Sequence, residues 1–164
     1  LEGNEYQLLM QSCKNNRAFW CPIIDFAIHS GMRRGELLSA TWQMVSFEKR
    51  IISLPAEITK TKRSRTVPLS DKAIEVLREL PRHISGRVFN MSLNYHNKGW
   101  RRLCKRAGVV GLRWHDLRRE NISRLFERWL SLTEVQSVSG HLTLQMLSTY
   151  TSHDAETLAI KLKK

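Results

Sequence analysis

The sequence predicts a mainly helical α+β domain that contains one small antiparallel β-sheet. Apolar residues recur at helical spacing through most of the chain, whereas residues 50–69 contain short β-type segments separated by polar turns. The length of 164 residues and a composition that is 41% hydrophobic and 26% charged suit one compact domain with its own core. We therefore expect residues 1–164 to form a single domain. Because the chain starts with Leu1 rather than Met, we expect it to be a fragment of a longer protein.

Three helices are predicted ahead of the sheet. Residues 5–14 form the first, which is short. Residues 19–30 form a longer one, because apolar side chains recur there at i, i+3, i+4 and i+7, and Gly31 supplies a C-terminal stop. A short helix is predicted over residues 34–41.

The sheet and the later helices follow from turn and capping residues. Pro68 falls at the end of the last predicted strand, where a missing N–H is tolerated. Ser70 is a typical N-cap for a helix that ends near Leu80. The predicted strands are 50–54, 56–60 and 65–69. The later helices are predicted at 92–107, 115–130, 133–138 and 143–151, with a last amphipathic helix or tail at 154–164.

The charge balance favours a polyanionic partner. Lys and Arg number 27 against 15 acidic residues, which gives a net charge of +12, and ten basic residues but only three acidic ones lie between Lys98 and Arg128. Such an excess favours nucleic acid over an anionic membrane. No apolar run approaches the roughly 20 residues that cross a bilayer, and no signal-peptide pattern opens the chain. We therefore expect a cytoplasmic protein without a membrane partner.

The cysteines and histidines do not predict a metal site. Cys13, Cys21 and Cys104 form no Cys-x-x-Cys pair and are odd in number, which is typical of free thiols in a reducing compartment. The six histidines are scattered too widely to bind zinc together. We expect neither a metal nor another cofactor.

His115 and Arg118 lie on the apolar side of their predicted helix. At about 100° per residue, both fall within the apolar stripe that continues from Ile122 to Trp129. An inward-facing Arg is costly to desolvate unless it meets a partner. A bound phosphate and a structural carboxylate such as Glu36 both satisfy that need, and the spacing does not choose between them.

Two further segments contain residue types that serve in catalysis or in DNA binding. His141 and Tyr150 are nine residues apart and would lie on opposite faces of one unbroken helix, so they converge only if the chain breaks between them, for which Thr143 is a suitable N-cap. A core histidine and a half-buried tyrosine are the structural alternative. The basic run from Lys60 to Arg65 between two strands is either a solvated turn or a tip that enters a DNA groove.

Taken together and in order, these segments resemble the catalytic domain of the tyrosine recombinases, the phage-integrase family. The resemblance covers about residues 19–151. The matching residues are Gly31, Arg33, Glu36 and Leu37 of the first box, Lys60 on the hairpin ahead of Pro68, His115 and Arg118 of the His-x-x-Arg box, Gly140 and His141, and the tyrosine Tyr150. The departures are Ser139 in place of Leu, Asn121 in place of Ala, Trp129 in place of Gly, Leu147 in place of Thr, and His153 three positions after the tyrosine instead of two.

The resemblance implies a role for each matching residue. Tyr150 would be the nucleophile and His115 the base that removes its proton, since a tyrosine with a pKa near 10 is mostly protonated at neutral pH. Arg33 and Arg118 would bind the phosphate oxygens in bidentate fashion. His141 would add a hydrogen bond to the same oxygens, and Lys60 would protonate the leaving 5′ oxygen.

The remaining candidates support this set. Glu36 would position a site arginine or serve the fold alone, and the two roles are equally compatible with the sequence. We expect Lys62, Arg63, Arg65 and Arg119 to contact DNA phosphates rather than to act in catalysis. Tyr6, Tyr95 and His153 are not expected to take part.

The resemblance also implies the reaction and its setting. Strands of double-stranded DNA would be cut and rejoined through a 3′-phosphotyrosyl intermediate without ATP or a divalent cation, as in phage or mobile-element integration and excision. Relaxation of DNA by a type IB topoisomerase and a catalytically silent DNA-binding module are the alternatives. Family members add an N-terminal DNA-binding domain and work as homotetramers on synapsed DNA in the cytoplasm, associated with the nucleoid. The isolated domain is expected to be monomeric, and residues 154–164 either dock onto a neighbour or pack on their own domain.

Overall fold

The computed structural model describes residues 1, 3–13 and 20–150. It divides the chain into two compact units, Leu1–Asn121 and Ile122–Lys164, and the boundary falls within a helix. The predicted C-terminal helix or tail at 154–164 and His153 lie outside the described residues. Within the described part of the chain, no helix has both the length and the apolar character of a membrane span.

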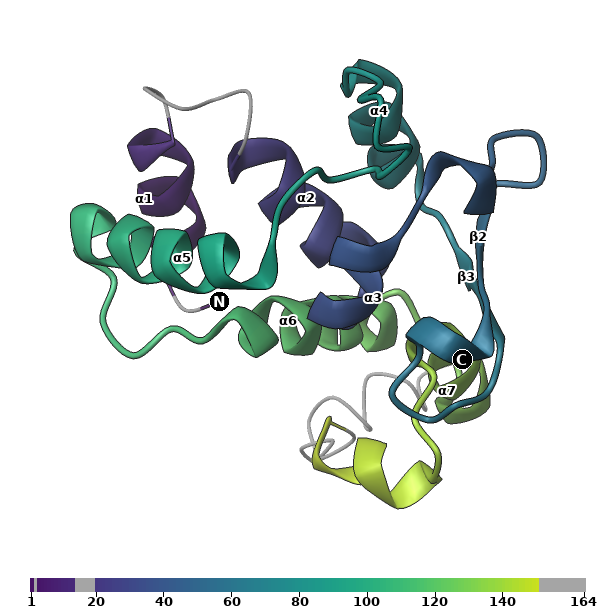
Figure 1. Ribbon diagram of the computed structural model, residues 1–164. Coiled ribbons are helices and arrows are strands. Elements are labelled where there is room, and N and C mark those ends of the chain that lie inside the picture. The colour runs from purple at the N-terminus through teal and green to yellow at the C-terminus, as the bar shows by residue number, and fades with distance from the viewer. Residues whose placement is uncertain (2, 14–19, 151–164) are drawn as a thin grey trace. The chain divides into compact units, whose positions relative to one another are not determined.

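The first unit combines helices with one small sheet (Figure 1). In the view of Figure 1, α1, α2 and α5 lie together on its left and the strands β2 and β3 on its right. Its helices are α1 (Glu5–Ser12), α2 (Trp20–Ser30), α3 (Arg34–Ser39), α4 (Asp71–Glu79), α5 (Leu93–Ala107) and the start of α6 (Trp114–Glu127), with 3₁₀ turns η2 (Trp42–Met44) and η3 (Ala56–Ile58). The strands are β1 (Val45–Ser46), β2 (Ile51–Leu54) and β3 (Arg65–Pro68). The mainly helical α+β prediction is confirmed.

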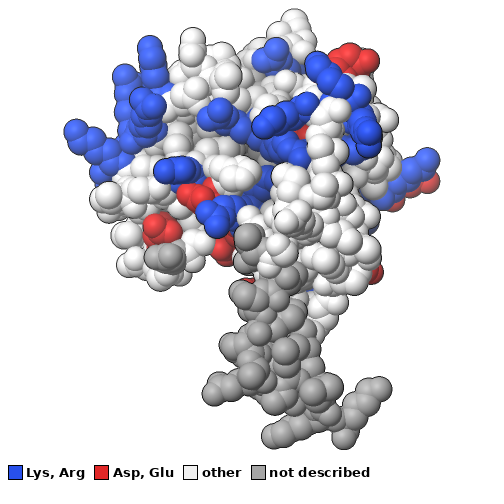
Figure 2. Space-filling model, turned by 90° about the horizontal axis from the view of Figure 1, so that it is seen from below, with Lys and Arg blue, Asp and Glu red and all other residues white. Residues whose placement is uncertain are grey.

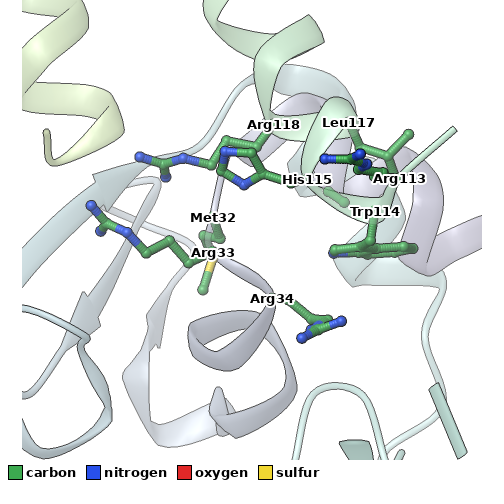
Figure 3. A pocket seen from close by; sticks show the side chains of 9 residues that line it. Met32, Arg33, Arg34, Arg113, Trp114, His115, Leu117 and Arg118 are labelled. Carbon is green, nitrogen blue, oxygen red and sulfur yellow. The ribbon is translucent and has the colours of Figure 1, made fainter. Parts of the chain in front are cut away.

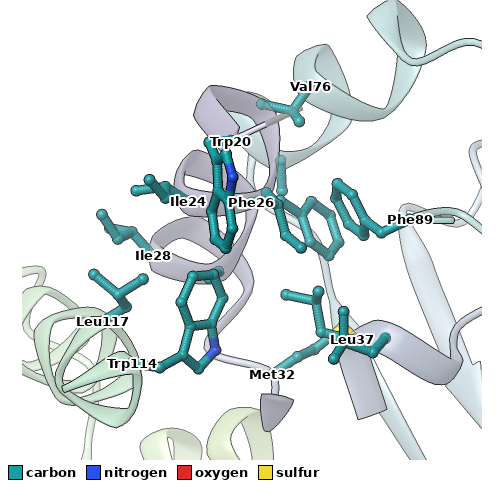
Figure 4. Packing of buried hydrophobic residues seen from close by; sticks show 14 of the residues in the cluster. Trp20, Ile24, Phe26, Ile28, Met32, Leu37, Val76, Phe89, Trp114 and Leu117 are labelled. Carbon is teal, nitrogen blue, oxygen red and sulfur yellow. The ribbon is translucent and has the colours of Figure 1, made fainter. Parts of the chain in front are cut away.

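A single apolar core holds the first unit together. In Figure 4 the indole ring of Trp114 lies below that of Trp20 beside α2, and the two rings are edge-on with centroids 6.4 Å apart. Phe26 meets Phe89 with ring centroids 5.4 Å apart. Trp114 lies edge-on to Trp100, with a centroid distance of 5.0 Å. Aromatic rings bury large apolar areas and prefer such tilted arrangements. Because Trp114 opens α6, this core fixes where the helix that carries His115 and Arg118 begins.

The sheet corrects one predicted strand. The order is β1-β2-β3 and both pairs are antiparallel, with Ile52 opposite Val67. Residues 56–60 are not a strand but the 3₁₀ turn η3 followed by an ordinary turn. The reason is that β2 pairs directly with β3, so the residues between them serve as the connection. The short β1 strand on the other side of β2 was not predicted.

The helix boundaries follow local capping. Ser70 accepts a hydrogen bond from the Ala73 N–H at 3.3 Å, as predicted for an N-cap. Ser92 caps α5 through the Tyr95 N–H in the same way.

The described part of the second unit packs around its own small cluster. Ile122, Val135 and Leu147 are buried in it. Its elements are the end of α6, α7 (Leu132–Ser139) and the 3₁₀ segment η4 (Leu144–Tyr150). Gly140 ends α7 in the left-handed conformation with φ +67°. His141 follows this end and Tyr150 closes η4, so the two residues do not share one unbroken helix, in agreement with the separate helices predicted at 133–138 and 143–151.

The prediction that Trp129 lies on the inner stripe of α6 is wrong. The helix ends at Glu127, and Trp129 has φ +64° with 67% of its surface exposed. Its N–H bonds the Phe126 carbonyl at 2.9 Å and the Leu130 N–H bonds the Leu125 carbonyl at 3.3 Å. These two bonds form a Schellman motif, whose left-handed position favours glycine, and they account for the turn of Trp129 away from the stripe.

This geometry predicts that glycine at position 129 stabilises the protein relative to alanine. Any side chain with a β-carbon is strained in the left-handed region by roughly 1–2 kcal/mol, and Trp129→Gly removes that strain. We expect Trp129→Gly to be more stable than Trp129→Ala by about 1 kcal/mol in urea unfolding. Equal stability of the two variants would contradict the assigned cap.

Candidate active site

Arg118 and Asn121 attach α6 to the C-terminal end of α2. Arg118 Nη1 donates to the Gly31 carbonyl at 2.6 Å, and Asn121 Nδ2 donates to the Ile28 carbonyl at 2.8 Å. Both side chains are buried, Arg118 to 3% exposure. The carbonyls at a helix end lack partners within the helix, so these two bonds satisfy them.

Gly31 is required at this junction. Its φ is +60°, and a β-carbon there would lie 2.2 Å from Asn121 Oδ1. Asn121 stands where the family commonly has Ala, and the structure gives this departure a packing role. Of the two partners considered for Arg118, Glu36 instead pairs with Arg33 and Arg65, and Arg118 donates to the Gly31 carbonyl.

Arg33, His115 and Arg118 line one cavity of about 250 Å³. In Figure 3 the side chains of Arg33 and Arg118 extend in the same direction, with the His115 ring beside Arg118. The described lining residues are Ala27, Met32, Arg33, Arg34, Arg113, Trp114, His115, Leu117 and Arg118, and none of them is acidic. The cavity therefore suits an anion.

The carboxylate of Glu36 organises the arginine side of the site. Glu36 is 1% exposed and accepts hydrogen bonds from Arg33 Nη1 at 3.1 Å and from Arg65 Nη2 at 2.7 Å. It also accepts from the Arg33 backbone N–H at 2.9 Å. Burial alone raises the pKa of this carboxyl group, but the bonds from Arg65 and Arg33 outweigh burial and lower the pKa. Glu36 is therefore ionised and anchors both arginines.

His115 is kept neutral by its surroundings. Burial lowers its pKa below the ordinary value, and the nearby Arg118 charge lowers the pKa further. At neutral pH the imidazole therefore has a lone pair available to accept a proton.

The hairpin that carries Lys60 is organised around Thr59. The Thr59 hydroxyl is buried and lies 3.1 Å from the Ala56 carbonyl and 2.8 Å from the Arg63 carbonyl. These bonds close the turn and leave Lys60, Lys62 and Arg63 exposed. Lys60 is thus presented to solvent near the hairpin tip and is not among the described residues that line the cavity.

His141 is oriented within the second unit. Its Nδ1 lies 2.7 Å from the Ser139 hydroxyl, and its carbonyl accepts a bond from Gln136 Nε2 at 3.2 Å. Ser139 is completely buried.

Tyr150 ends η4 in the same unit. Its side chain is half-buried against the cluster of Ile122, Val135 and Leu147.

The other tyrosines have different environments. The Tyr6 hydroxyl donates to Asp25 Oδ1 at 2.6 Å, and Tyr95 is 54% exposed on α5.

The candidates divide as follows. Arg33, His115 and Arg118 are brought together in the first unit, and Glu36 supports Arg33. The catalytic roles predicted from the sequence, and the DNA contacts predicted for Lys62, Arg63, Arg65 and Arg119, stay predictions. Arg119 is exposed beside Asp116, at 3.8 Å, and Arg65 is mostly buried on Glu36.

Three features of the site were not predicted from the sequence. Arg65, for which a DNA contact was predicted, is the second cation on Glu36. The signal was the buried acid of the first box, which needs more than one charge partner when fully desolvated. Arg34 and Arg113 were given no role, although both flank residues of the matching boxes.

Residues 1–157 match the model of the phage integrase family. The chain belongs to this family. It is 33% identical over 163 residues to the shufflon-specific DNA recombinase of Escherichia coli, which covers 99% of this chain and 42% of that protein. It is 42% identical over 135 residues to an integrase/recombinase of Haemophilus influenzae described as putative, covering 79% of this chain and 35% of the relative. The chain thus spans about two fifths of the length of these family members.

Solved structures show the same fold. The catalytic domain of bacteriophage HP1 integrase superposes with a TM-score of 0.71 at 25% identity, covering 99% of this chain and 93% of that one. A Tn1549 transposon integrase in complex with circular intermediate DNA superposes with a TM-score of 0.79 at 16% identity, covering 99% and 64%. The predicted tyrosine recombinase catalytic-domain fold is confirmed.

The Glu36 cluster predicts a pH-dependent loss of stability. Arg65→Gln leaves the buried carboxylate with one arginine, which costs about 3 kcal/mol of unfolding free energy at pH 7. Because the folded-state pKa of Glu36 is lowered, its contribution is present above the unfolded pKa near 4.5 and is lost as the pH falls through the folded value. Urea unfolding at pH 7 and at pH 3.5 should therefore show a difference between parent and variant that shrinks at the lower pH.

Arg50→Gln is the matched control. Arg50 pairs with Asp71 on the surface, where side-chain exposures are 47% and 86%, and exposed pairs contribute little. A loss from Arg50→Gln as large as that from Arg65→Gln would contradict the special role of Glu36.

Proposed function

We propose that this protein cuts and rejoins strands of double-stranded DNA at specific sites, with Tyr150 forming a covalent bond to the 3′ phosphate. The observation that carries the proposal is the cavity where Arg33, His115 and Arg118 meet without an acidic residue among its described lining. The family and the recombinase names of its members support the same reaction class.

The chemistry is a transfer of one phosphoryl group. The Tyr150 oxygen attacks the phosphorus of a backbone diester, and His115 accepts the phenolic proton. The bond from phosphorus to the 5′ oxygen breaks, and Lys60 gives that oxygen a proton. Rejoining is the same step in reverse, so the diester energy is kept in the tyrosyl ester and no redox partner is needed.

Two fixed guanidinium groups would stabilise the negative charge of the transition state. Arg118 is held by the Gly31 carbonyl and Arg33 by the Glu36 carboxylate, at 2.6 Å and 3.1 Å. Donors that are already oriented need no reorganisation as charge develops on the phosphate oxygens. His141 adds one more donor to the same oxygens.

Glu36 and Arg65 connect this cavity to the hairpin. Arg65 is the first residue of β3, five positions after Lys60, and its Nη2 binds Glu36 at 2.7 Å. We therefore assign Glu36 to the positioning of Arg33 and, through Arg65, of the hairpin base.

The partner is proposed to be double-stranded DNA. The net charge is +12, and Figure 2 shows Lys and Arg side chains covering far more of the displayed face than Asp and Glu. Exposed Lys62, Arg63 and Arg119 suit phosphate contacts. We propose further that the chain is the catalytic domain of a longer recombinase, which acts as a homotetramer on synapsed DNA.

Removal of the nucleophile is the first test. Tyr150→Phe should bind a nicked duplex as tightly as the parent and form no covalent adduct, measured as a protein–DNA band on a denaturing gel in the presence of EDTA. Tyr95→Phe, at an exposed tyrosine, should keep full adduct formation. An adduct that persists in Tyr150→Phe, or one that requires magnesium, would refute the proposal.

Arg118→Lys tests the need for a planar fork. The three donors of a lysine ammonium group sit on one nitrogen, so they lack the planar spacing that lets Arg118 bind the Gly31 carbonyl with one nitrogen and a phosphate with others. We expect single-turnover cleavage to fall by a factor of about 10² to 10³, with DNA affinity changed less than tenfold. Near-normal cleavage would show that charge alone is enough.

His115 predicts the acid limb of the pH–rate profile. Protonation of the base stops the attack, and its pKa lies below the ordinary value of 6.5. The midpoint of the decline in single-turnover cleavage should therefore lie below pH 6.5, and this decline should be absent in His115→Gln. A midpoint above pH 7 would exclude His115 as the base.

A further inference from the structure

The cavity contains two arginines that the proposed reaction does not use. Arg34 and Arg113 both line it. In Figure 3 the side chains of Arg33 and Arg118 extend to the left of the view, whereas those of Arg34 and Arg113 lie to the right, with Trp114 between them. The cavity therefore presents cations in two separate places.

The charges in the part of the cavity near Arg34 and Arg113 favour the binding of an anion. Among the described residues, no ion pair joins Arg34 or Arg113 to a carboxylate. The histidine on the same cavity is neutral at pH 7, because its pKa is lowered. A hollow lined by one sign of charge concentrates counter-ions.

Both arginines are supported by their neighbours. Arg34 Nη1 donates to Asn97 Oδ1 on α5 at 2.8 Å. The Arg113 backbone N–H donates to Asp116 Oδ2, also at 2.8 Å, which fixes the turn ahead of α6. Between them, Trp114 is 7% exposed and packs edge-on against His96 with a centroid distance of 4.3 Å. The Arg34 guanidinium group is thus held by α5, and the backbone of Arg113 is fixed at the start of α6.

We propose that Arg34 and Arg113 form a second phosphate subsite, which binds the phosphate next to the scissile one on the same DNA strand. This inference rests on the proposed function, because the scissile phosphate at Arg33 and Arg118 sets where the next phosphate falls. Every nucleotide of a strand carries one charge, so a strand that crosses the cavity brings a second phosphate to it. The subsite fixes the register of the strand and takes no part in bond breaking.

The test combines substitution of the two arginines with DNA in which one backbone phosphate is replaced by an uncharged group. Arg34→Gln/Arg113→Gln and the parent chain are compared on nicked duplexes with a methylphosphonate at the phosphate on either side of the scissile one. A third duplex carries the methylphosphonate several nucleotides away, and Arg78→Gln on α4 is the protein control. The dissociation constant is measured against salt concentration.

A methylphosphonate at one of the two neighbouring positions should lower the DNA affinity of the parent about tenfold. The same methylphosphonate should lower the affinity of the double variant less than twofold. The salt slope of the double variant should fall by about 0.9 for the lost contact. Equal losses for parent and variant at both neighbouring positions would overturn the subsite. Absence of any adduct from the parent on unmodified DNA would instead overturn the proposed reaction, and the binding comparison would still decide the subsite.

The bond between Ser139 and His141 carries a second, independent inference. The Ser139 hydroxyl is completely buried and lies 2.7 Å from His141 Nδ1. A leucine, which is usual at this position in the family, has no group that can make this bond. The partner of one ring nitrogen of a histidine decides which nitrogen carries the proton.

We infer that Ser139 is a positioning residue for His141. The hydroxyl lies 2.7 Å from Nδ1 but 3.5 Å from a second acceptor, the Gln136 carbonyl. It therefore donates to Nδ1 and places the ring proton on Nε2, the nitrogen that would donate to a phosphate oxygen. This role also rests on the proposed function, but the tautomer can be measured without DNA.

Nitrogen NMR of the histidine rings tests this role directly. In the parent chain His141 should be the Nε2–H tautomer, in Ser139→Ala a mixture of tautomers, and in Ser139→Thr, which keeps a hydroxyl, again Nε2–H. Cleavage by Ser139→Ala should fall about tenfold, with recovery in Ser139→Thr. An Nδ1–H tautomer in the parent, or the same tautomer in the parent and in Ser139→Ala, would overturn the inference. If the parent has the expected tautomer but forms no adduct, the proposed reaction fails and the positioning role stands.

Discussion

The site depends on a buried carboxylate. Glu36 is 1% exposed and joins Arg33, at the start of α3, to Arg65, at the start of β3. A charge at that depth is tolerated only when several donors surround it. Glu36 therefore fixes both arginines and, with them, the start of α3 and the start of β3. α3 lies beside the cavity, and β3 follows the hairpin of Lys60.

The second constraint is the junction of α2 and α6. Arg118 and Asn121 satisfy carbonyls at the end of α2, and Gly31 allows their close approach. The bond from Arg118 to the Gly31 carbonyl offsets part of the cost of burying its guanidinium group to 3% exposure.

Local patterns predicted most helices and the matching boxes. Ser70, Gly31 and the apolar spacing of α2 each determine a boundary through short-range chemistry, so they could be recognised in the sequence. The strand predicted at 56–60 failed because its residues have strand-like composition but no strand to pair with. The prediction that Trp129 lies on the inner face of α6 failed because a Schellman motif ends the helix before this residue. Tryptophan is unusual in the left-handed position of this motif, where glycine is common.

The partners of the site residues were harder to predict. Nothing local in the sequence indicates that Arg65 turns to Glu36 across 29 positions, because that contact depends on tertiary packing. The contact of Ser139 with the His141 ring spans only two positions and depends on the left-handed turn at Gly140 between them.

The most direct measurement is a structure of this chain trapped on a nicked duplex. We predict a bond from the Tyr150 oxygen to the 3′ phosphorus, with nitrogens of Arg33 and Arg118 about 2.8 Å from the non-bridging oxygens. A phosphate held elsewhere, or joined to a different side chain, would contradict this prediction.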